Sequence, residues 1–247
     1  MNIPKIIHYC WFGRQEKPEK VKKCIESWEK FCPDYQIICW NEDNYKIESK
    51  CAFVQEAYRA GKWAFVSDYA RIEVVYEHGG VYLDTDVELL KPLDDIICQG
   101  AYAGFEDKAF VATGLGFAGS AGDKVLKRML ERYHELVFDV KRFSDIKCPV
   151  INTAVFREFG LITDGSYQKL ACGWRILPQE YLCPMDLHTG KCRITENTIS
   201  IHHYDASWQS SGEYHKNRLI IGIKKILPEK LISGIQHLIR SMRRQHG

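Results

Sequence analysis

Short apolar runs along the chain alternate with stretches in which apolar residues recur at helical spacing. Apolar runs at 4–13 and 35–40 flank residues 18–31, where apolar side chains recur every three or four positions and Pro18 suits a first helical turn. This pattern predicts a strand, a helix and a second strand. Such an arrangement is typical of a β-α-β unit with parallel strands.

Two further helices are predicted next, and a short strand follows them. Residues 51–61 end at Gly61, and residues 63–80 carry one apolar stripe before the helix stop at Gly79. The stripe consists of Phe65, Tyr69, Ile72 and Tyr76. Strands are predicted at 81–84, 101–106, 114–120 and 198–204, and an amphipathic helix at 123–137. The predicted fold class is therefore α/β.

Composition supports one well-packed domain. The 247 residues are 45% hydrophobic and 12% aromatic, which argues against disorder over most of the chain. Lys and Arg total 34 against 32 for Asp and Glu, so overall charge gives no case for binding nucleic acid. We expect one main domain at 1–210 and a basic, helical extension at 211–247.

The cysteine pattern bears on the compartment in which the protein works. Ten cysteines are scattered without a CxxC pair, and the opening residues lack a charged start followed by a long apolar run. No apolar stretch is long enough to span a bilayer. We therefore expect reduced thiols and a cytoplasmic protein.

Two carboxylates, Asp84 and Asp86, stand one residue apart behind the apolar strand at 81–84. Side chains two positions apart on a strand point to the same face. Neighbouring carboxylates repel each other unless a positive charge lies between them. The pair predicts a site for a divalent cation, and the alternative is a solvated turn.

Other residues could join such a site. Asp68 and Arg71 lie three apart on the helix before the acidic pair, and the Arg71 guanidinium suits phosphate oxygens; the alternative is a surface salt bridge. Trp11 follows the first strand, where its ring could stack on a nucleobase or pack in the core. One imidazole of His202 or His203 could complete the shell of the metal, or simply be a satisfied loop histidine.

These side chains are expected to meet at one edge of the sheet. Ligands in open α/β sheets bind beyond the carboxyl ends of the strands, and the runs at 4–13 and 81–84 both present polar or aromatic residues there. A metal, an arginine and a stacking aromatic ring together describe a site for a nucleoside diphosphate.

Residues 67–94, SDYARIEVVYEHGGVYLDTDVELLKPLD, resemble the signature of family-thirty-two glycosyltransferases of bacteria and fungi. The sugar-binding region of that family contains a DXD motif. Residues 67–94 are also similar, more distantly, to the glucosyltransferase domains of large clostridial toxins. Residues 3–13 and the Ser207-Trp208 pair match the same pattern. The resemblance implies a GT-A fold, which is a Rossmann-like mixed sheet flanked by helices. It also implies a nucleotide-sugar donor, expected to be a UDP-sugar, with Mn²⁺ or Mg²⁺ and retention at the anomeric carbon.

The resemblance also assigns roles to individual residues. Asp84, Asp86 and Arg71 would form the catalytic group, and Asp86 and His202 would bind the metal. The expected donor-binding residues are Trp11, Asp68, Arg71, Asp84, Asn152, Ser207 and Trp208. Among these, Asn152 lies in a middle stretch of the chain, 147–156, that departs from the family pattern.

We therefore expect a retaining hexosyltransferase that acts on a glycan or a lipid-linked oligosaccharide. The family context is bacterial capsular polysaccharide or lipopolysaccharide synthesis. No carboxylate nucleophile stands out, so we expect same-face attack with the leaving phosphate as base. One alternative is a metal-dependent phosphohydrolase, although Glu88 stands where its acidic motif usually has Thr or Val. The other is a nucleotide- or glycan-binding module without turnover.

The tail carries a second amphipathic pattern. Leu231, Ile235, Leu238 and Met242 fall at helical spacing over 231–247, and arginines gather towards the end. Such a helix could lie on an anionic membrane, which would make the protein peripheral on the inner face of the cell membrane. The alternative is that its apolar face packs against the catalytic domain.

Overall fold

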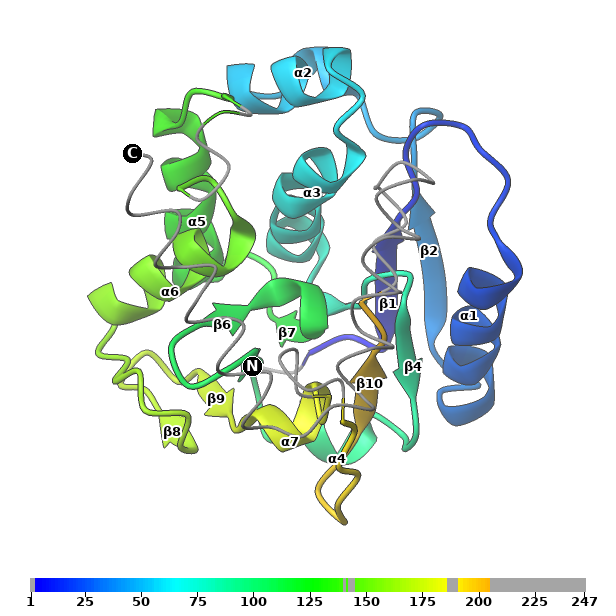
Figure 1. Ribbon diagram of the computed structural model, residues 1–247, viewed down its shortest axis with the longest axis vertical. Coiled ribbons are helices and arrows are strands. Elements are labelled where there is room, and N and C mark those ends of the chain that lie inside the picture. Colours follow the sequence, from blue (N-terminus) through cyan, green and yellow to red (C-terminus); the bar gives the residue numbers. More distant parts are fainter. Residues whose placement is uncertain (1–2, 140, 142–144, 186–190, 205–247) are drawn as a thin grey trace, which may run out of the picture. The chain divides into compact units, whose positions relative to one another are not determined.

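The computed structural model describes residues 3–139, 141, 145–185 and 191–204 (Figure 1). One compact unit comprises Met1–Pro184 and Ile194–Tyr204. Met185 and residues 191–193 belong to a second unit, in which Met185 and Cys192 form an isolated antiparallel bridge. The predicted boundary at residue 210 and the predicted helix at 231–247 lie outside the described residues and stay predictions.

An eight-stranded mixed sheet forms the centre of the first unit. Its order is β2-β1-β3-β7-β5-β9-β8, with β6 paired to β5. β1 runs parallel to β2 and β3, and β5 runs parallel to β9, whereas the remaining pairs are antiparallel. The bounds are Ile6–Cys10 for β1, Gln36–Trp40 for β2, Gly80–Tyr82 for β3, Tyr102–Phe105 for β5, Val111–Ala112 for β6, Phe117–Gly119 for β7, Gln168–Lys169 for β8 and Arg175–Leu177 for β9. Two strands stand apart as a small antiparallel sheet, β4 (Val87–Leu89) and β10 (Ser200–His202).

The helices agree with most of the predicted pattern. They are α1 Glu19–Phe31, α2 Ala52–Arg59, α3 Trp63–His78, α4 Asp94–Ile97, α5 Lys124–Glu135, α6 Cys148–Glu158 and α7 Gln179–Leu182, with 3-10 turns η1 Ile47–Ser49 and η2 Thr113–Leu115. The predicted β-α-β unit is confirmed by β1, α1 and β2. Periodicity did not predict α6, and the strand expected over 114–120 is shortened to β7 because η2 takes up its first residues.

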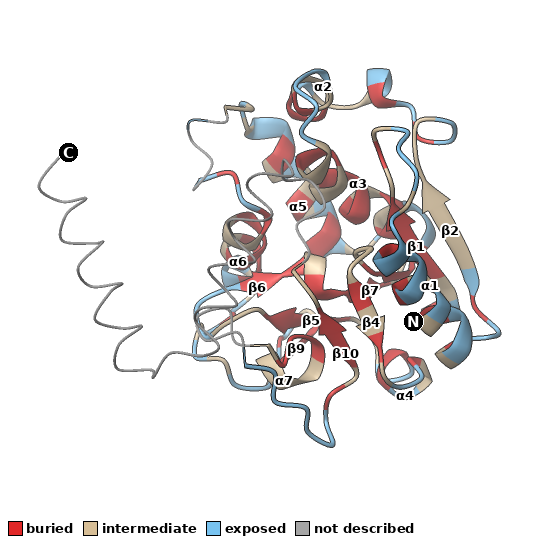
Figure 2. Cartoon of the chain, turned by 45° about the vertical axis from the view of Figure 1, so that its right-hand side comes forward, coloured by how far each residue is buried: buried red, intermediate tan, exposed pale blue. Residues whose placement is uncertain are grey.

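Alternate strand residues serve two cores on opposite faces of the sheet, as the two-residue period of a strand requires. Cys10, Tyr82 and Phe105 belong to the core that contains α3, α5 and α6. Tyr9 and Leu83 belong to the core on the side of α1. Figure 2 shows the central strands and the inner faces of the helices buried, whereas the edge strand β2 is intermediate and the outer face of α1 is exposed. The expected α/β class with a GT-A type sheet flanked by helices is confirmed.

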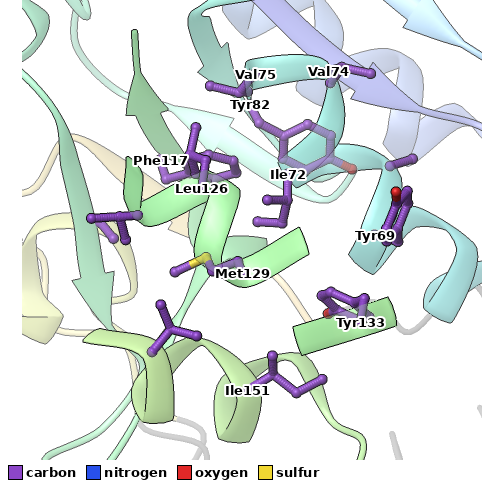
Figure 3. Packing of buried hydrophobic residues seen from close by; sticks show 14 of the residues in the cluster. Tyr69, Ile72, Val74, Val75, Tyr82, Phe117, Leu126, Met129, Tyr133 and Ile151 are labelled. Carbon is purple, nitrogen blue, oxygen red and sulfur yellow. The ribbon is translucent and has the colours of Figure 1, made fainter. Parts of the chain in front are cut away.

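Helix α3 is buried on more than one face, although the sequence predicted a single stripe. Besides the predicted positions, Val66, Val74 and Val75 are at most 1% exposed. The side chains of α3 and α5 meet in one core, and the rings of Tyr69 and Tyr133 lie 5.7 Å apart (Figure 3). A helix with apolar residues on more than one face packs inside a protein rather than on its surface. Polar residues on α3, such as Arg71, are therefore buried as well.

The strand register brings two predicted site segments to one edge. His8 pairs with Tyr82 in the parallel β1–β3 ladder, and the Leu83 N–H donates to the His8 carbonyl at 3.0 Å. Both strands therefore end at the same edge, where Trp11 follows β1 and Asp84 follows β3. This adjacency agrees with the expectation from the sequence.

His8 is a wholly buried histidine between these strands and α3. Its Nε2 lies 2.8 Å from the Gly79 carbonyl, and the Trp40 indole donates to its Nδ1 at 3.1 Å. A neutral ring with its proton on Nε2 satisfies both contacts. Burial lowers the pKa of His8 from 6.5 to about 4.

The first prediction concerns the effect of His8 on stability in acid. The folded pKa lies below the unfolded value, so the unfolded chain binds the proton more readily and stability falls as the pH drops from about 6.5 to 4. The loss should approach roughly 3 kcal/mol. We expect His8→Gln, which cannot titrate, to show a shallower fall in the free energy of unfolding, measured by urea titration at pH 7, 5.5 and 4. The same pH dependence in both proteins would contradict this role.

Candidate active site

Asp84 and Asp86 lie in the turn that joins β3 to β4. β3 ends at Tyr82, and the Val87 N–H donates back to the Asp84 carbonyl at 3.0 Å. The prediction that the two carboxylates share one face of a strand is therefore wrong, because this hydrogen bond closes the chain into a turn. The turn still brings the carboxylates together. One oxygen of each and a ring nitrogen of His202 all lie within 4.8 Å of one another.

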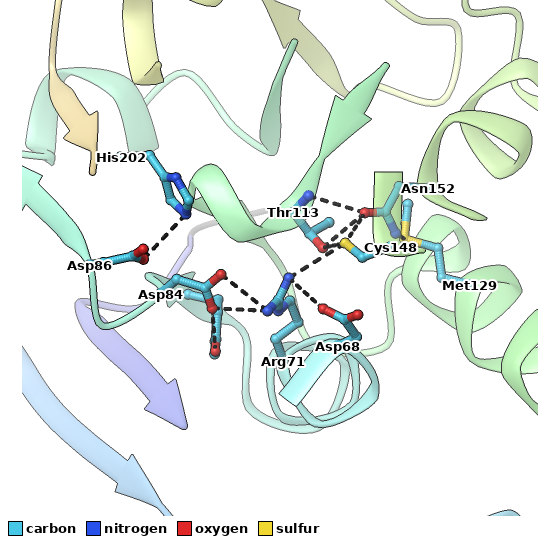
Figure 4. Close-up of polar contacts among 10 residues, drawn as sticks. Asp68, Arg71, Asp84, Asp86, Thr113, Met129, Cys148, Asn152 and His202 are labelled. Atoms are coloured by element: carbon cyan, nitrogen blue, oxygen red, sulfur yellow. Dashed lines mark hydrogen bonds and ion pairs between the residues drawn. The ribbon is translucent and has the colours of Figure 1, made fainter. Parts of the chain in front are cut away.

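The small antiparallel sheet places His202 beside this turn. His202 pairs with Val87 in the β4–β10 register, and the His203 N–H donates to the Asp86 carbonyl at 2.9 Å. The His202 Nε2 consequently lies 3.2 Å from the Asp86 Oδ1 (Figure 4). The His203 ring instead contacts Glu88 at 2.8 Å. Of the two histidines, His202 is the one at the acidic pair.

The Arg71 guanidinium is held between two carboxylates. Its Nη1 lies 3.0 Å from the Asp68 Oδ1, and its Nη2 donates to both oxygens of Asp84 at 2.9 and 3.1 Å (Figure 4). The side chain is only 6% exposed, so the alternative of a surface salt bridge is wrong. Asp68 and Asp84 contact Nη1 and Nη2, whereas the buried Nε has no hydrogen-bond partner within the described part of the chain. The expected contact of Arg71 with a phosphate stays a prediction. The Tyr82 hydroxyl adds a hydrogen bond of 2.9 Å to Asp84.

Burial controls the electrostatics of this group. It raises the pKa of Asp68 to about 6, against the opposing influence of Arg71, and the charge of Asp84 adds to the rise. It also raises the pKa of Asp84, again opposed by Arg71. Burial disfavours the charge of Arg71, but Asp84 and Asp68 outweigh it and raise the pKa of Arg71 well above its usual value. When all are ionised, Asp68, Asp84 and Asp86 against one guanidinium leave two net negative charges.

The donor set fits a divalent cation. Carboxylate oxygens suit Mg²⁺ and Mn²⁺, and an imidazole nitrogen favours transition metals such as Mn²⁺ over Mg²⁺. Asp84, Asp86 and His202 are clustered closely enough to share one ion, which would offset the two net negative charges. Asp84 already accepts hydrogen bonds from Arg71 and Tyr82, which fix the orientation of its carboxylate. These residues could hold Mn²⁺ or Mg²⁺, and their role as ligands stays a prediction.

Gly114 is a site residue that the sequence reading missed. It lies in η2, where an added Cβ would come within 2.7 Å of the Asp84 Oδ2 and 3.1 Å of the Arg71 Nη1. Contacts that short require a neighbour to move. The backbone of η2 therefore packs directly on the ion pair of Asp84 and Arg71. Only the glycine itself, within a stretch read as a strand, could have indicated this close approach.

Asn152 is hydrogen-bonded to another part of the chain. It is wholly buried in α6, and its Oδ1 accepts hydrogen bonds from the Thr113 N–H at 3.1 Å and the Thr113 hydroxyl at 2.9 Å. Cys148 donates to the same oxygen at 2.9 Å. Asn152 therefore anchors Thr113 of η2, which packs on Asp84. Its assignment as a donor-binding residue stays a prediction.

The remaining predicted residues are placed less centrally. Trp11 is partly exposed, packs against the core on the side of α1, and donates from its indole to the Gln15 carbonyl at 2.6 Å. This placement suits neither alternative exclusively, so stacking on a base stays a prediction. Ser207 and Trp208 lie outside the described residues.

Comparison with known proteins gives this arrangement a context. Residues 18–103 match the family model described as "Glycosyltransferase sugar-binding region containing DXD motif". The matched segment contains Asp68, Arg71, Asp84 and Asp86. This segment of the chain is thus similar to the sugar-binding region of DXD-containing glycosyltransferases.

Two relatives and one solved structure extend the comparison. The chain is 30% identical over 129 residues, 45% of its length, to inositol phosphoceramide mannosyltransferase 1 of Schizosaccharomyces pombe, of which 39% is covered. It is 31% identical over 105 residues, 40% of its length, to the uncharacterized glycosyltransferase L373 of Acanthamoeba polyphaga mimivirus, of which 42% is covered. The chain therefore spans about two fifths of the length of these curated relatives.

The solved structure is the PaToxG glycosyltransferase, which is similar with a TM-score of 0.52 at 17% identity over 63% of this chain and 69% of that one. At this identity the similarity concerns the fold alone. A glycosyltransferase with a similar fold agrees with the fold that the resemblance implies.

The second prediction tests the close approach of η2. Gly114→Ala should displace the Asp84 carboxylate and weaken binding of Mn²⁺ by ~10-fold or more, as loss of outer-shell support commonly does. Electron paramagnetic resonance of free Mn²⁺ measures the affinity, and circular dichroism checks that the variant is folded. Parental affinity in a folded variant would show that Asp84 does not depend on this contact.

Proposed function

We propose that this protein is a metal-dependent glycosyltransferase that moves a sugar from a nucleotide-sugar donor to a saccharide acceptor. The donor would be a UDP-sugar carrying a hexose, and the acceptor a glycan or a lipid-linked oligosaccharide. One observation carries the proposal: Asp84, Asp86 and His202 offer ligand atoms within 4.8 Å of one another, next to the buried Arg71. Asp84, Asp86 and Arg71 lie in the segment that matches the family model.

The reaction requires stabilisation of a departing diphosphate. A divalent cation, when bound, supplies positive charge to those phosphate oxygens. The chain contributes the geometry: Arg71 holds Asp84 in one orientation, and the β4–β10 pairing holds His202 beside Asp86. Groups held in advance of reaction in a water-poor site stabilise developing charge better than mobile ones. Trp11, at the same sheet edge, would stack on the base of the nucleotide.

We further propose retention of anomeric configuration, with same-face attack and the leaving phosphate as base. This part rests on the resemblance to family-thirty-two and toxin glycosyltransferases. Arg71 is proposed to support the reaction by holding Asp84, with which it forms an ion pair, and by contacting the donor diphosphate.

The biological setting is proposed on the same basis. Synthesis of a capsular polysaccharide or lipopolysaccharide in a bacterium, by a cytoplasmic protein at the inner face of the membrane, is the family-level expectation. The Schizosaccharomyces pombe relative is named an inositol phosphoceramide mannosyltransferase, so mannosyl donors and lipid acceptors belong in any substrate panel. Among the described residues, no helix is long and apolar enough to cross a membrane.

Incubation with a panel of UDP- and GDP-sugars and Mn²⁺ tests the proposal against its two alternatives. Slow, metal-dependent hydrolysis of one donor supports a transferase. Release of phosphate from monoesters would instead support a phosphohydrolase. Nucleotide binding without any turnover would support a binding module.

The third prediction concerns Asp86. Asp86→Ala should lower Mn²⁺-dependent donor turnover by ~100-fold or more, because the cation that stabilises the departing diphosphate would lose a carboxylate ligand. Glu88→Gln is the matched control, since Glu88 follows two residues later and contacts His203 rather than the acidic pair. Full turnover by Asp86→Ala, or an equal loss in both variants, would remove Asp86 from the metal site.

The fourth prediction concerns Trp11. Trp11→Ala should weaken the binding of UDP by ~1–3 kcal/mol if the ring stacks on the base. Trp11→Phe should recover most of that affinity, because it restores an aromatic face. Isothermal titration with UDP and Mn²⁺ measures both. Unchanged affinity in folded Trp11→Ala would assign the ring to the core.

A further inference from the structure

Three elements from distant parts of the chain meet beside His202. Glu106 directly follows β5, Cys183 directly follows α7, and Tyr204 lies just beyond β10. α7 packs closely on β5, because Gly104 leaves room: an added Cβ would come within 2.7 Å of the Leu182 Cδ1. The backbone of β10 is in turn tied to α7, since the Ile199 N–H donates to the Tyr181 carbonyl at 2.8 Å.

The Tyr204 ring lies against the His202 imidazole. The two ring centroids are 4.2 Å apart and the planes meet at 75°, an edge-to-face contact. Tyr204 also has a φ of +51°, in the left-handed region that residues other than glycine seldom adopt. Such a conformation persists only where the surroundings hold it, so the contacts of the side chain matter here.

The Tyr204 hydroxyl has two anchors. It lies 2.9 Å from the Cys183 Sγ, and either atom of this pair can be the donor. It also interacts with the Glu106 carboxyl. The far end of the ring is therefore fixed to β5 and α7 while its edge contacts His202.

His202 lacks the usual means of orientation for a metal-binding histidine. Such histidines almost always donate their second ring N–H to a carboxylate, a carbonyl or water. The His202 Nδ1 is buried, and within the described part of the chain it has no hydrogen-bond partner. Packing must therefore set the angle at which its Nε2 faces Asp86.

We propose that Tyr204, anchored by Glu106 and Cys183, is the positioning residue that orients the His202 imidazole for a divalent cation. This inference rests on the proposed metal-dependent function. The edge-to-face contact with Tyr204 would orient the imidazole, a role that a hydrogen bond at Nδ1 usually has. The left-handed backbone at Tyr204 would be needed to place the ring for this contact.

The test is the Mn²⁺ affinity of the full chain without substrate, measured by electron paramagnetic resonance. Tyr204→Gly accepts the left-handed backbone but removes the ring, so it should weaken binding of Mn²⁺ by ~10-fold or more. Tyr204→Phe keeps the ring contact and loses the anchors, so its affinity should lie between those of Tyr204→Gly and the parent. His203→Gln is the matched control, because His203 contacts Glu88, and it should bind like the parent.

His202→Ala separates failure of this inference from failure of the metal site. Weak binding by His202→Ala together with parental binding by Tyr204→Gly would overturn the role of Tyr204 and leave the proposed function standing. Parental binding by His202→Ala would overturn both the inference and the assignment of His202 as a ligand. Equal losses in Tyr204→Gly and Tyr204→Phe would show that the ring contact is not the cause, and would overturn the inference as well. Thermal unfolding without metal verifies that each variant is folded.

Discussion

The ion pair network of Arg71 with Asp68 and Asp84 is the interaction on which the rest of the site depends. It joins the buried helix α3 to the turn that follows β3. Removing one partner of a buried ion pair typically costs about 3–5 kcal/mol, since the other charge is left without compensation. Asp84 is consequently held in one position relative to the core, and this fixes the turn that contains Asp84 and Asp86. Arg71 thus acts as the support of the site rather than as a surface charge.

The second constraint is the meeting of segments far apart in the sequence. The pairing of β4 with β10 carries His202 to Asp86, and η2 reaches Asp84 because residue 114 has no side chain. Each contact depends on backbone register or on the absence of a Cβ. A cation bound by Asp84, Asp86 and His202 would connect the edge of the main sheet to the small sheet. Binding of the nucleotide through that cation would then depend on the position of β10, which carries His202.

The sequence predicted the elements well where burial is periodic. α1, α2, α3 and α5 carry apolar positions at helical spacing, and Gly79 ends α3 with a φ of +66°. Prediction from the sequence was less successful where hydrogen bonds between distant residues, or within a turn, determine the local structure. The turn at Asp84 is closed by a backbone hydrogen bond that alternation cannot reveal. The hydrogen bonds between Asn152 and Thr113 could not be predicted either, because Thr113 lies on a different element.

The candidate site was predictable in part for a related reason. Asp68, Arg71, Asp84 and Asp86 lie close together in the sequence, so one motif contains them all. His202 was identified through the family resemblance, whereas Gly114 and Tyr204 act through contacts that only the folded chain creates. Anomalous X-ray diffraction from crystals soaked in Mn²⁺ and UDP tests most directly whether Asp84, Asp86 and His202 bind one divalent cation. We expect one strong peak about 2.0–2.4 Å from ligand atoms of these three residues. A peak elsewhere, or none at this cluster, would contradict this assignment.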